Sequence, residues 1–122
     1  MDLKVKLYIV DDKGEKFMGI GVLWLLERVE SLGSLRAAAK DMTISYTKAY
    51  NMVKRLEATL GHEVLEMRRG GASHDGACLT AFGRRLCSLY RDFQQEAKER
   101  VMEPYGTFKS RLEEMMEERT DG

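Results

Sequence analysis

The segment 34–56, SLRAAAKDMTISYTKAYNMVKRL, constrains the fold of this chain more than any other stretch. Apolar residues recur at helical spacing on both sides of a break at residues 42–44, and Ser45 is of a type that starts helices. The small residues Ala37 to Ala39 allow a second helix to cross the first closely, and Ile44 can fill the corner. The pattern predicts two short helices joined by a tight turn, a helix-turn-helix.

The second of these helices, expected from Ser45 to about Leu60, divides its side chains between two faces. The outer face is rich in hydrogen-bonding groups and short of carboxylates, which suits a helix lying in the major groove of DNA. Taken alone, the segment fits an ordinary amphipathic helix with a hydrated face equally well. The apolar stripe contains Ala49, Met52, Val53, Leu56 and Leu60.

The chain that follows predicts a β-hairpin. Residues 64–69 alternate apolar and polar side chains like a half-buried strand, and residues 77–80 read as a second short strand. Between them, residues 70–76 hold three glycines and do not fit regular structure. This glycine cluster lacks the Lys-Ser/Thr that ends a nucleotide-binding P-loop. A helix-turn-helix followed by a basic hairpin is a winged helix.

Several of these motifs together resemble a known family. Ser34–Leu56, the Arg69-Gly70-Gly71 step and Phe82-Gly83-Arg84 are similar to the amino-terminal DNA-binding domain of ModE-type molybdate-dependent transcription regulators. The Gly-Ser-Leu and Leu-Glu-x-x-Leu-Gly steps also resemble the wider LysR-type regulators. The resemblance spans about residues 4–93 and implies a winged helix-turn-helix that binds DNA as a homodimer. One departure is the wing tip, where residues 73–75 are Ser, His and Asp and the family has more glycine.

The resemblance also implies something about ligands. ModE-type regulators bind molybdate in a carboxy-terminal pair of small β-barrel modules, but no β-rich pattern follows Thr80 here. We therefore expect the DNA-binding half alone, with no cofactor and no molybdate site of the family's kind. The sequence leaves open whether the protein binds DNA constitutively or responds to a small-molecule effector or a partner.

Charge is segregated along the chain, although its formal net charge is +0. Residues 34–91 hold ten Lys and Arg against five Asp and Glu, residues 1–33 hold five against six, and residues 92–122 hold five against nine. Binding to phosphate depends on the local patch rather than on the total charge. The segregation favours double-stranded DNA as a partner of the central segment and places the acidic tail away from it.

The flanking segments are expected to support this central domain. Residues 3–10 and 15–18 predict a hairpin, and residues 20–32 predict a helix that ends at Gly33. Trp24 in that helix is assigned to core or dimer packing rather than to stacking on a ligand. A helix capped by Thr80 carries Phe82, Leu86, Leu89, Tyr90 and Phe93 on one side.

The apolar pattern continues beyond residue 93, and Pro104 and Gly106 predict a kink or break near Glu103. The expected fold is thus mainly α with small β-hairpins (α+β), a winged helix-turn-helix with a long C-terminal dimerisation helix. We divide it into a DNA-binding domain, residues 1–93, and a helical extension, residues 94–122, that dimerises through its long apolar stripe. The resemblance to the ModE-type family implies that two copies then bind successive half-sites of a near-palindromic operator.

Roles in DNA binding follow from position on the reading helix and the wing. Tyr46, Thr47, Lys48 and Asn51 are the candidates for the major groove. Asn51 can pair with adenine, Lys48 can reach guanine acceptors, and Thr47 offers a hydroxyl or methyl group. The candidates on the flanks and the wing are assigned to the backbone or minor groove. For Tyr50, packing at the helix crossing is an almost equal alternative. The candidate DNA-contacting residues are Arg36, Ser45, Tyr46, Thr47, Lys48, Tyr50, Asn51, Lys54, Arg68, Arg69, Ser73 and His74.

Other classes of function find little support. His62 and His74 form no convincing relay with a nucleophile, so we do not expect an enzyme, and Cys78 and Cys87 read as reduced apolar residues rather than a disulfide or a metal pair. No apolar run reaches the length of a membrane span and no secretory leader is evident, so we expect a cytoplasmic protein without membrane contact. The serious alternative is a winged-helix adaptor that binds proteins without specific DNA binding.

Overall fold

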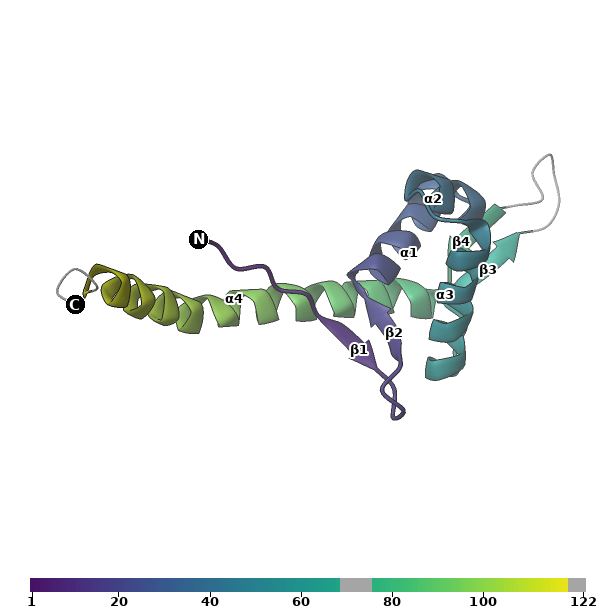
Figure 1. Cartoon of the computed structure of the whole chain (residues 1–122). Helices are drawn as coiled ribbons and strands as arrows, with labels where there is room; N and C mark the ends of the chain where they lie inside the picture. Colours follow the sequence, from purple (N-terminus) through teal and green to yellow (C-terminus); the bar gives the residue numbers. More distant parts are fainter. Residues whose placement is uncertain (69–75, 119–122) are drawn as a thin grey trace.

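A short head and one long helix make up the computed structural model, which describes residues 1–68 and 76–118. Figure 1 shows that the other elements gather around one end of α4, which then extends away from them. The predicted fold class, mainly α with small antiparallel hairpins, is confirmed. The elements in chain order are β1 (Tyr8–Val10), β2 (Lys16–Gly19), α1 (Ile20–Leu32), α2 (Leu35–Asp41), α3 (Tyr46–Leu60), β3 (Leu65–Arg68), β4 (Gly76–Leu79) and α4 (Ala81–Glu118).

Helix α1 forms the centre of the head. Its inner face is buried against α2, β4 and α4. The helix begins and ends where the sequence predicts. It ends at Leu32 because Gly33 takes a left-handed φ of 75° and donates its N–H to the Val29 carbonyl at 2.8 Å. Of the two roles expected for Trp24, core packing is wrong, since its side chain is 47% exposed, and dimer packing stays a prediction. The buried residues of α1 are Val22, Leu23, Leu25, Leu26 and Val29.

The predicted helix-turn-helix is confirmed, and two serines set its helix starts. The Ser34 hydroxyl accepts the Ala37 N–H, and the Ser45 hydroxyl accepts the Lys48 N–H, both at 3.0 Å. In the turn between the helices, Thr43 takes a positive φ of 59°. Alanines Ala38, Ala39 and Ala49 are buried in α2 and α3, as small residues at a close helix crossing should be.

Two antiparallel hairpins flank these helices. Strands β3 and β4 pair Leu65 with Leu79 and Arg68 with Gly76, which confirms the predicted wing strands to within a residue at each end. Strand β1 is shorter than predicted, because β2 ends at Gly19 and α1 begins directly after it. Residues 3–7 instead run beside α4 (Figure 1), and the Leu7 carbonyl accepts the Tyr90 hydroxyl proton at 2.9 Å.

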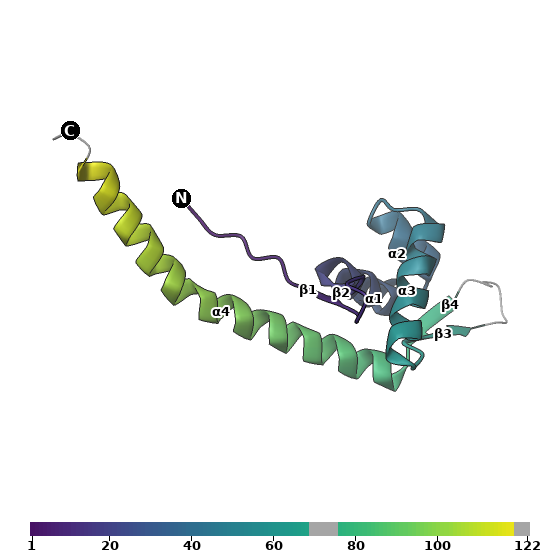
Figure 2. The same ribbon diagram turned by 60° about the horizontal axis from the view of Figure 1, so that its bottom comes forward.

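Of the predicted kink or break near Glu103, the break is wrong, because α4 is one continuous helix that contains Pro104. Proline removes one backbone hydrogen bond and crowds the preceding turn, which a long exposed helix can accommodate by bending. Figure 2 shows α4 bent along its length. The proposed domain boundary after residue 93 falls inside this helix, and the division stays a prediction.

The predicted apolar side of α4 is divided between the core and the surface. Tyr90 is buried, together with Cys87 one turn before it, whereas Leu89 is 70% exposed and Phe93 is 47% exposed. The head covers only the face of α4 that carries Cys87 and Tyr90. Both cysteines are free, as predicted, and burial raises the pKa of the Cys87 thiol to about 11. None of the described helices is long and apolar enough to cross a membrane.

Candidate nucleic-acid interface

The outward face of α3 is polar. Ala49, Val53 and Leu56 turn the opposite face into the core, which fixes the rotation of the helix. Thr47 and Asn51 then lie one turn apart on the exposed side. Between Tyr46 and Leu56 this helix carries no carboxylate. The face therefore offers hydrogen-bonding groups to a partner without presenting a negative charge at its centre.

One edge of this face is built from aromatic rings and cations. The Arg36 guanidinium of α2 lies 4.4 Å from the centre of the Tyr46 ring, and the Tyr46 and Tyr50 ring centres are 6.2 Å apart. The Lys54 ammonium lies 5.4 Å from the centre of the Tyr50 ring. Tyr46 is half-buried against the core. Tyr50 is 42% exposed, which argues against packing at the helix crossing and leaves it available at the interface.

Glu57 joins α3 to the wing, a role that our sequence analysis missed. One carboxylate oxygen accepts the Val64 N–H at 2.8 Å and the Leu65 N–H at 3.3 Å, while the other lies 3.3 Å from the Lys54 ammonium. The hydrogen bond to Glu57 raises the pKa of Lys54, so that this side chain stays cationic. The same carboxylate thus holds the start of β3 and places Lys54 beside the reading face.

The other edge of α3 faces the β1–β2 hairpin. Arg55 donates from Nη1 to the Glu15 carboxylate at 2.9 Å. Lys16, Lys48 and Arg55 border a hollow of about 400 Å³ whose remaining walls are largely apolar. Arg55 was also missed from the sequence, because an exposed arginine late in a helix has no local signal that distinguishes it from a hydrated one. Both edges of α3 therefore carry cations.

A carboxylate near the end of α1 binds the last residue of β4, where the chain leaves the wing. Glu30 accepts the Leu79 N–H at 3.0 Å and the Arg84 Nε–H at 3.2 Å. The Leu79 N–H chiefly lowers the pKa of Glu30, and the charges of Arg84 and Arg68 lower it further. Arg68 is exposed on β3. The other predicted wing contacts, Arg69, Ser73 and His74, lie outside the described residues.

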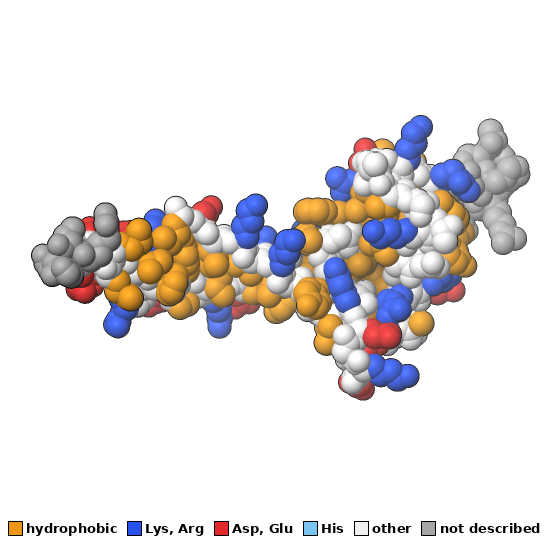
Figure 3. All heavy atoms as spheres, viewed as in Figure 1, with side chains coloured by type: hydrophobic (Ala, Val, Ile, Leu, Met, Phe, Trp, Pro, Cys, Tyr) orange, Lys and Arg blue, Asp and Glu red, His pale blue; other side chains and the backbone are white. Residues whose placement is uncertain are grey.

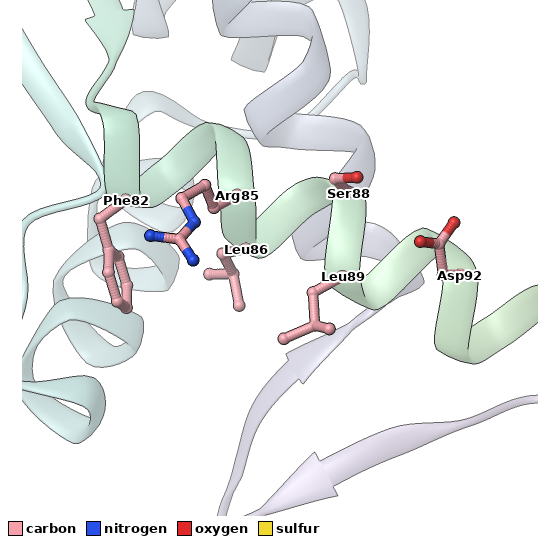
Figure 4. Close-up of a pocket in the computed structure, with 6 residues that line it drawn as sticks. All are labelled: Phe82, Arg85, Leu86, Ser88, Leu89 and Asp92. Atoms are coloured by element: carbon pink, nitrogen blue, oxygen red, sulfur yellow. The ribbon is translucent and has the colours of Figure 1, made fainter.

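A catalytic or metal arrangement is not evident in residues 1–68 and 76–118. No cluster of three or more His, Cys, Asp or Glu among these residues could hold a metal ion. The His62 ring stacks on Phe82 with ring centres 4.5 Å apart. A hollow of about 460 Å³ lies on the outer side of α4. Figure 4 shows Phe82, Leu86 and Leu89 pointing to one side there, with Ser88 pointing away. This hollow is an apolar surface rather than a reactive centre.

A helix-turn-helix followed by a two-stranded wing, with cations on both edges of its second helix, defines a winged helix-turn-helix protein. The family model described as "Bacterial regulatory helix-turn-helix protein, lysR family" matches residues 22–84. The chain belongs to this family of regulators, which confirms the regulator class expected from the sequence. The match begins in α1 and ends near the start of α4, so it covers the helix-turn-helix and the wing but not the β1–β2 hairpin.

Curated relatives include ModE proteins, as the sequence resemblance implied. The DNA-binding transcriptional dual regulator ModE of Escherichia coli K12 is 36% identical over 66 residues, covering 54% of this chain and 25% of that protein. The molybdenum transport protein ModE of Azotobacter vinelandii is 34% identical over 99 residues, covering 80% of this chain and 33% of that protein. The chain thus spans about a quarter to a third of the length of these relatives.

Solved structures of a LysR-type protein share the fold. The crystal structure of the CbnR_DBD-DNA complex has a TM-score of 0.54 and 30% identity, covering 67% of this chain and 88% of that chain. The structure of CbnR, a LysR family transcriptional regulator, has a TM-score of 0.53 and 30% identity, covering 67% of this chain and 27% of that chain. The matched part of this chain thus covers most of the CbnR_DBD chain and about a quarter of the CbnR chain.

Proposed function

We propose that this protein is a sequence-specific DNA-binding regulator of transcription that acts in the cytoplasm. Helix α3 lies in the major groove, and the β3–β4 wing follows the backbone or the minor groove. The observation that carries the proposal is the outward face of α3, which has polar groups at its centre, cations at both edges and no carboxylate from Tyr46 to Leu56. The likeness to CbnR, whose domain was crystallised on DNA, supports the same partner here.

The proposed contacts divide into base-reading and backbone-binding residues. Thr47, Lys48 and Asn51 read bases, because they lie on the first turns of α3, which enter the groove in helix-turn-helix proteins. The remaining candidates bind phosphate or the minor groove and set the orientation of the head. They are Arg36, Ser45, Tyr50, Lys54, Arg68, Arg69, Ser73 and His74. Tyr46, a groove candidate in the sequence, joins them because its ring is half-buried against the core.

We further propose that two copies bind a near-palindromic operator. Figure 3 shows hydrophobic side chains running along α4 away from the head. An exposed apolar stripe of this length is unfavourable in water, and a second copy of α4 would cover it. The exposed apolar residues of α4 that share one face at helical spacing, and that we assign to this contact, are Leu89, Phe93, Phe108 and Met115. Two heads on one dimer would then reach successive half-sites on one side of the duplex.

Substitutions on α3 and on the wing should separate base reading from phosphate binding. We expect Lys48→Ala and Asn51→Ala to reduce discrimination between bases at single operator positions by about tenfold, since a good side chain to base contact is worth about 1–3 kcal/mol. Arg68→Ala should instead weaken binding to every duplex alike. It should also reduce the slope of the logarithm of the binding constant against the logarithm of the salt concentration by about one, because one phosphate fewer is neutralised. Fluorescence anisotropy with a randomised set of duplexes at several salt concentrations measures both effects.

Lys109→Ala, on the distal part of α4, is the matched control and should leave both properties unchanged. The adaptor alternative makes a different prediction, since an adaptor has no specific affinity for duplex DNA. Absence of duplex binding at low salt by a folded dimer would decide for the adaptor and against the proposal.

A single charge in the apolar stripe of α4 should weaken the dimer. Phe108 is 59% exposed in the isolated chain, so Phe108→Asp should not disturb folding, but it would place a carboxylate in the proposed interface. We expect at least a tenfold increase in the dimer dissociation constant in sedimentation equilibrium. Ser110→Asp adds the same charge on the opposite side of α4 and should leave dimerisation intact. Equal effects of the two variants would contradict pairing through this stripe.

A further inference from the structure

A second hollow, separate from α3, lies where the N-terminal segment crosses α1 and α4. Its volume is about 430 Å³, within the range of small-molecule sites. Leu3 and Val5 form one wall, Ile20 and Trp24 of α1 form another, and Met102 closes the side toward the distal part of α4. Trp24, which the core does not use, is 47% exposed and presents a large flat surface for an aromatic ring.

The polar groups of this hollow point to a particular ligand chemistry. Gln94 lines it and is only 6% exposed. The Gln94 amide nitrogen donates to the Tyr90 hydroxyl oxygen at 3.3 Å, and that hydroxyl donates to the Leu7 carbonyl, which fixes the orientation of the amide. Its carbonyl oxygen has no hydrogen-bond partner within residues 1–68 and 76–118, and it keeps contact with solvent, since the enclosed side-chain polar atom without a partner in those residues is the Tyr105 hydroxyl oxygen. An acceptor that opens into a hollow can take a hydrogen bond from a ligand that brings a donor, in place of water.

The charge around the hollow is positive. Lys98 lies one turn beyond Gln94 on the same face of α4, and Lys4 and Lys6 come from the N-terminal segment. No Asp or Glu is among the residues that line the hollow. A ligand held between Trp24 and this face of α4 would therefore meet an acceptor at one position and ammonium groups at its edge.

We propose that this hollow binds a small aromatic carboxylate that carries a hydrogen-bond donor on its ring. The ring packs against Trp24 and the apolar walls, the donor meets the Gln94 carbonyl oxygen, and the carboxylate meets Lys98 with help from Lys4 and Lys6. The bound ligand would tie the N-terminal segment to α1 and α4, the elements from which the head and the long helix diverge. This provides a place for an effector inside the DNA-binding domain itself, and ligand binding at this site does not depend on DNA binding.

The chain has one tryptophan, so the Trp24 indole N–H gives a single resonance in a ¹H–¹⁵N correlation spectrum. We expect 4-hydroxybenzoate and 6-hydroxy-2-naphthoate to shift this resonance saturably, with Kd values of about 1 mM or tighter for ligands of this size. Benzoate, which lacks the donor, and 4-hydroxybenzamide, which lacks the charge, should each bind more weakly. The titration uses the full chain without DNA, so its failure and a failure of duplex binding are distinguishable.

Lys98→Ala should weaken binding of the two hydroxy acids about fivefold and leave the binding of 4-hydroxybenzamide unchanged. Lys109→Ala, farther along α4 and outside the hollow, should change neither. Equal affinities of these two variants for the hydroxy acids would overturn the proposal. The proposal would also fail if none of the four probes shifted the Trp24 resonance at concentrations up to about ten times the expected Kd. A resonance that shifted only with protein concentration would overturn it too, because this surface would then be a contact between copies.

Discussion

Replacing Gly83 with alanine lowers the free energy of unfolding by about 2 kcal/mol, because the added methyl group has no space. A Cβ at Gly83 would lie 2.3 Å from the carbonyl oxygen of Val64, and backbone cannot swing aside as a flexible side chain can. Alanine favours a helix over glycine by about 1 kcal/mol, so the steric cost must exceed that gain for the net effect to be destabilising. The contact is with the residue directly before β3, so α4 and the wing would have to separate.

Hydrogen bonds hold the start of α4 close to the residues that enter the wing. The Thr80 N–H donates to the Val64 carbonyl at 3.0 Å, and the Thr80 hydroxyl donates to the Glu63 carbonyl at 2.7 Å. The same hydroxyl oxygen accepts the Gly83 N–H at 2.9 Å, so one side chain both caps α4 and ties it to the chain entering the wing. Only a residue without a Cβ at position 83 permits this arrangement.

Urea unfolding of Gly83→Ala and Gly106→Ala provides the measurement. Gly106 lies in the same helix, and a Cβ there would meet nothing within 4 Å, so alanine should stabilise the protein by about 0.5–1 kcal/mol through helix propensity alone. The two variants make the same chemical change and should shift the midpoint in opposite directions. A midpoint for Gly83→Ala at or above that of the unchanged protein would show that α4 and the wing are not held at this distance.

The sequence predicted the elements whose signals are local. Ser34 and Ser45 each precede a helix whose N–H groups they accept, and Gly33 has the left-handed conformation that ends α1. These are interactions between residues three or four positions apart, so they are written into short stretches of the chain. The outward placement of Thr47 and Asn51 followed in the same way from the period of the helix.

The failures concern interactions that no short stretch specifies. Pro104 and Gly106 predicted a kink or break, and α4 bends but does not break (Figure 2), because a single missing hydrogen bond does not outweigh the helix on both sides. The positive φ of Thr43 is unusual for a β-branched residue and is imposed by the turn between α2 and α3. The exposure of Trp24 and Leu89 depends on which side of each helix the head covers, and that is a tertiary property.

The edges of the candidate interface were hidden for the same reason. Arg55 meets Glu15, 40 positions earlier in the chain, and Glu30 meets the backbone of Leu79, 49 positions later. Within one helical turn of sequence, each of these residues looks like an ordinary exposed charged side chain. Only the folded chain shows that Arg55 joins α3 to the β1–β2 hairpin and that Glu30 joins α1 to the wing.

Replacing Glu57 with alanine should lower the free energy of unfolding by about 2–3 kcal/mol, since it leaves two partly buried N–H groups without their acceptor. Those groups belong to Val64 and Leu65, where the chain leaves α3 and enters the wing. The loss exceeds that of a surface ion pair because the Lys54 contact, to a half-exposed ammonium, contributes about 0.5 kcal/mol at most. Urea unfolding measures the total loss of stability, and faster hydrogen exchange at the Val64 amide would show that the loss arises at the start of the wing.

Two further variants separate the hydrogen bonds from the charge. Glu57→Gln keeps an oxygen acceptor and removes the charge, so it should lose about 1 kcal/mol or less, whereas Glu66→Ala, at an exposed position of β3, should change stability by less than about 0.5 kcal/mol. If Glu57→Ala matches Glu66→Ala, the carboxylate does not hold the wing. If instead the loss is as large as expected, binding to every duplex should weaken as well, because the wing would no longer keep its angle to α3 and both must touch one double helix together.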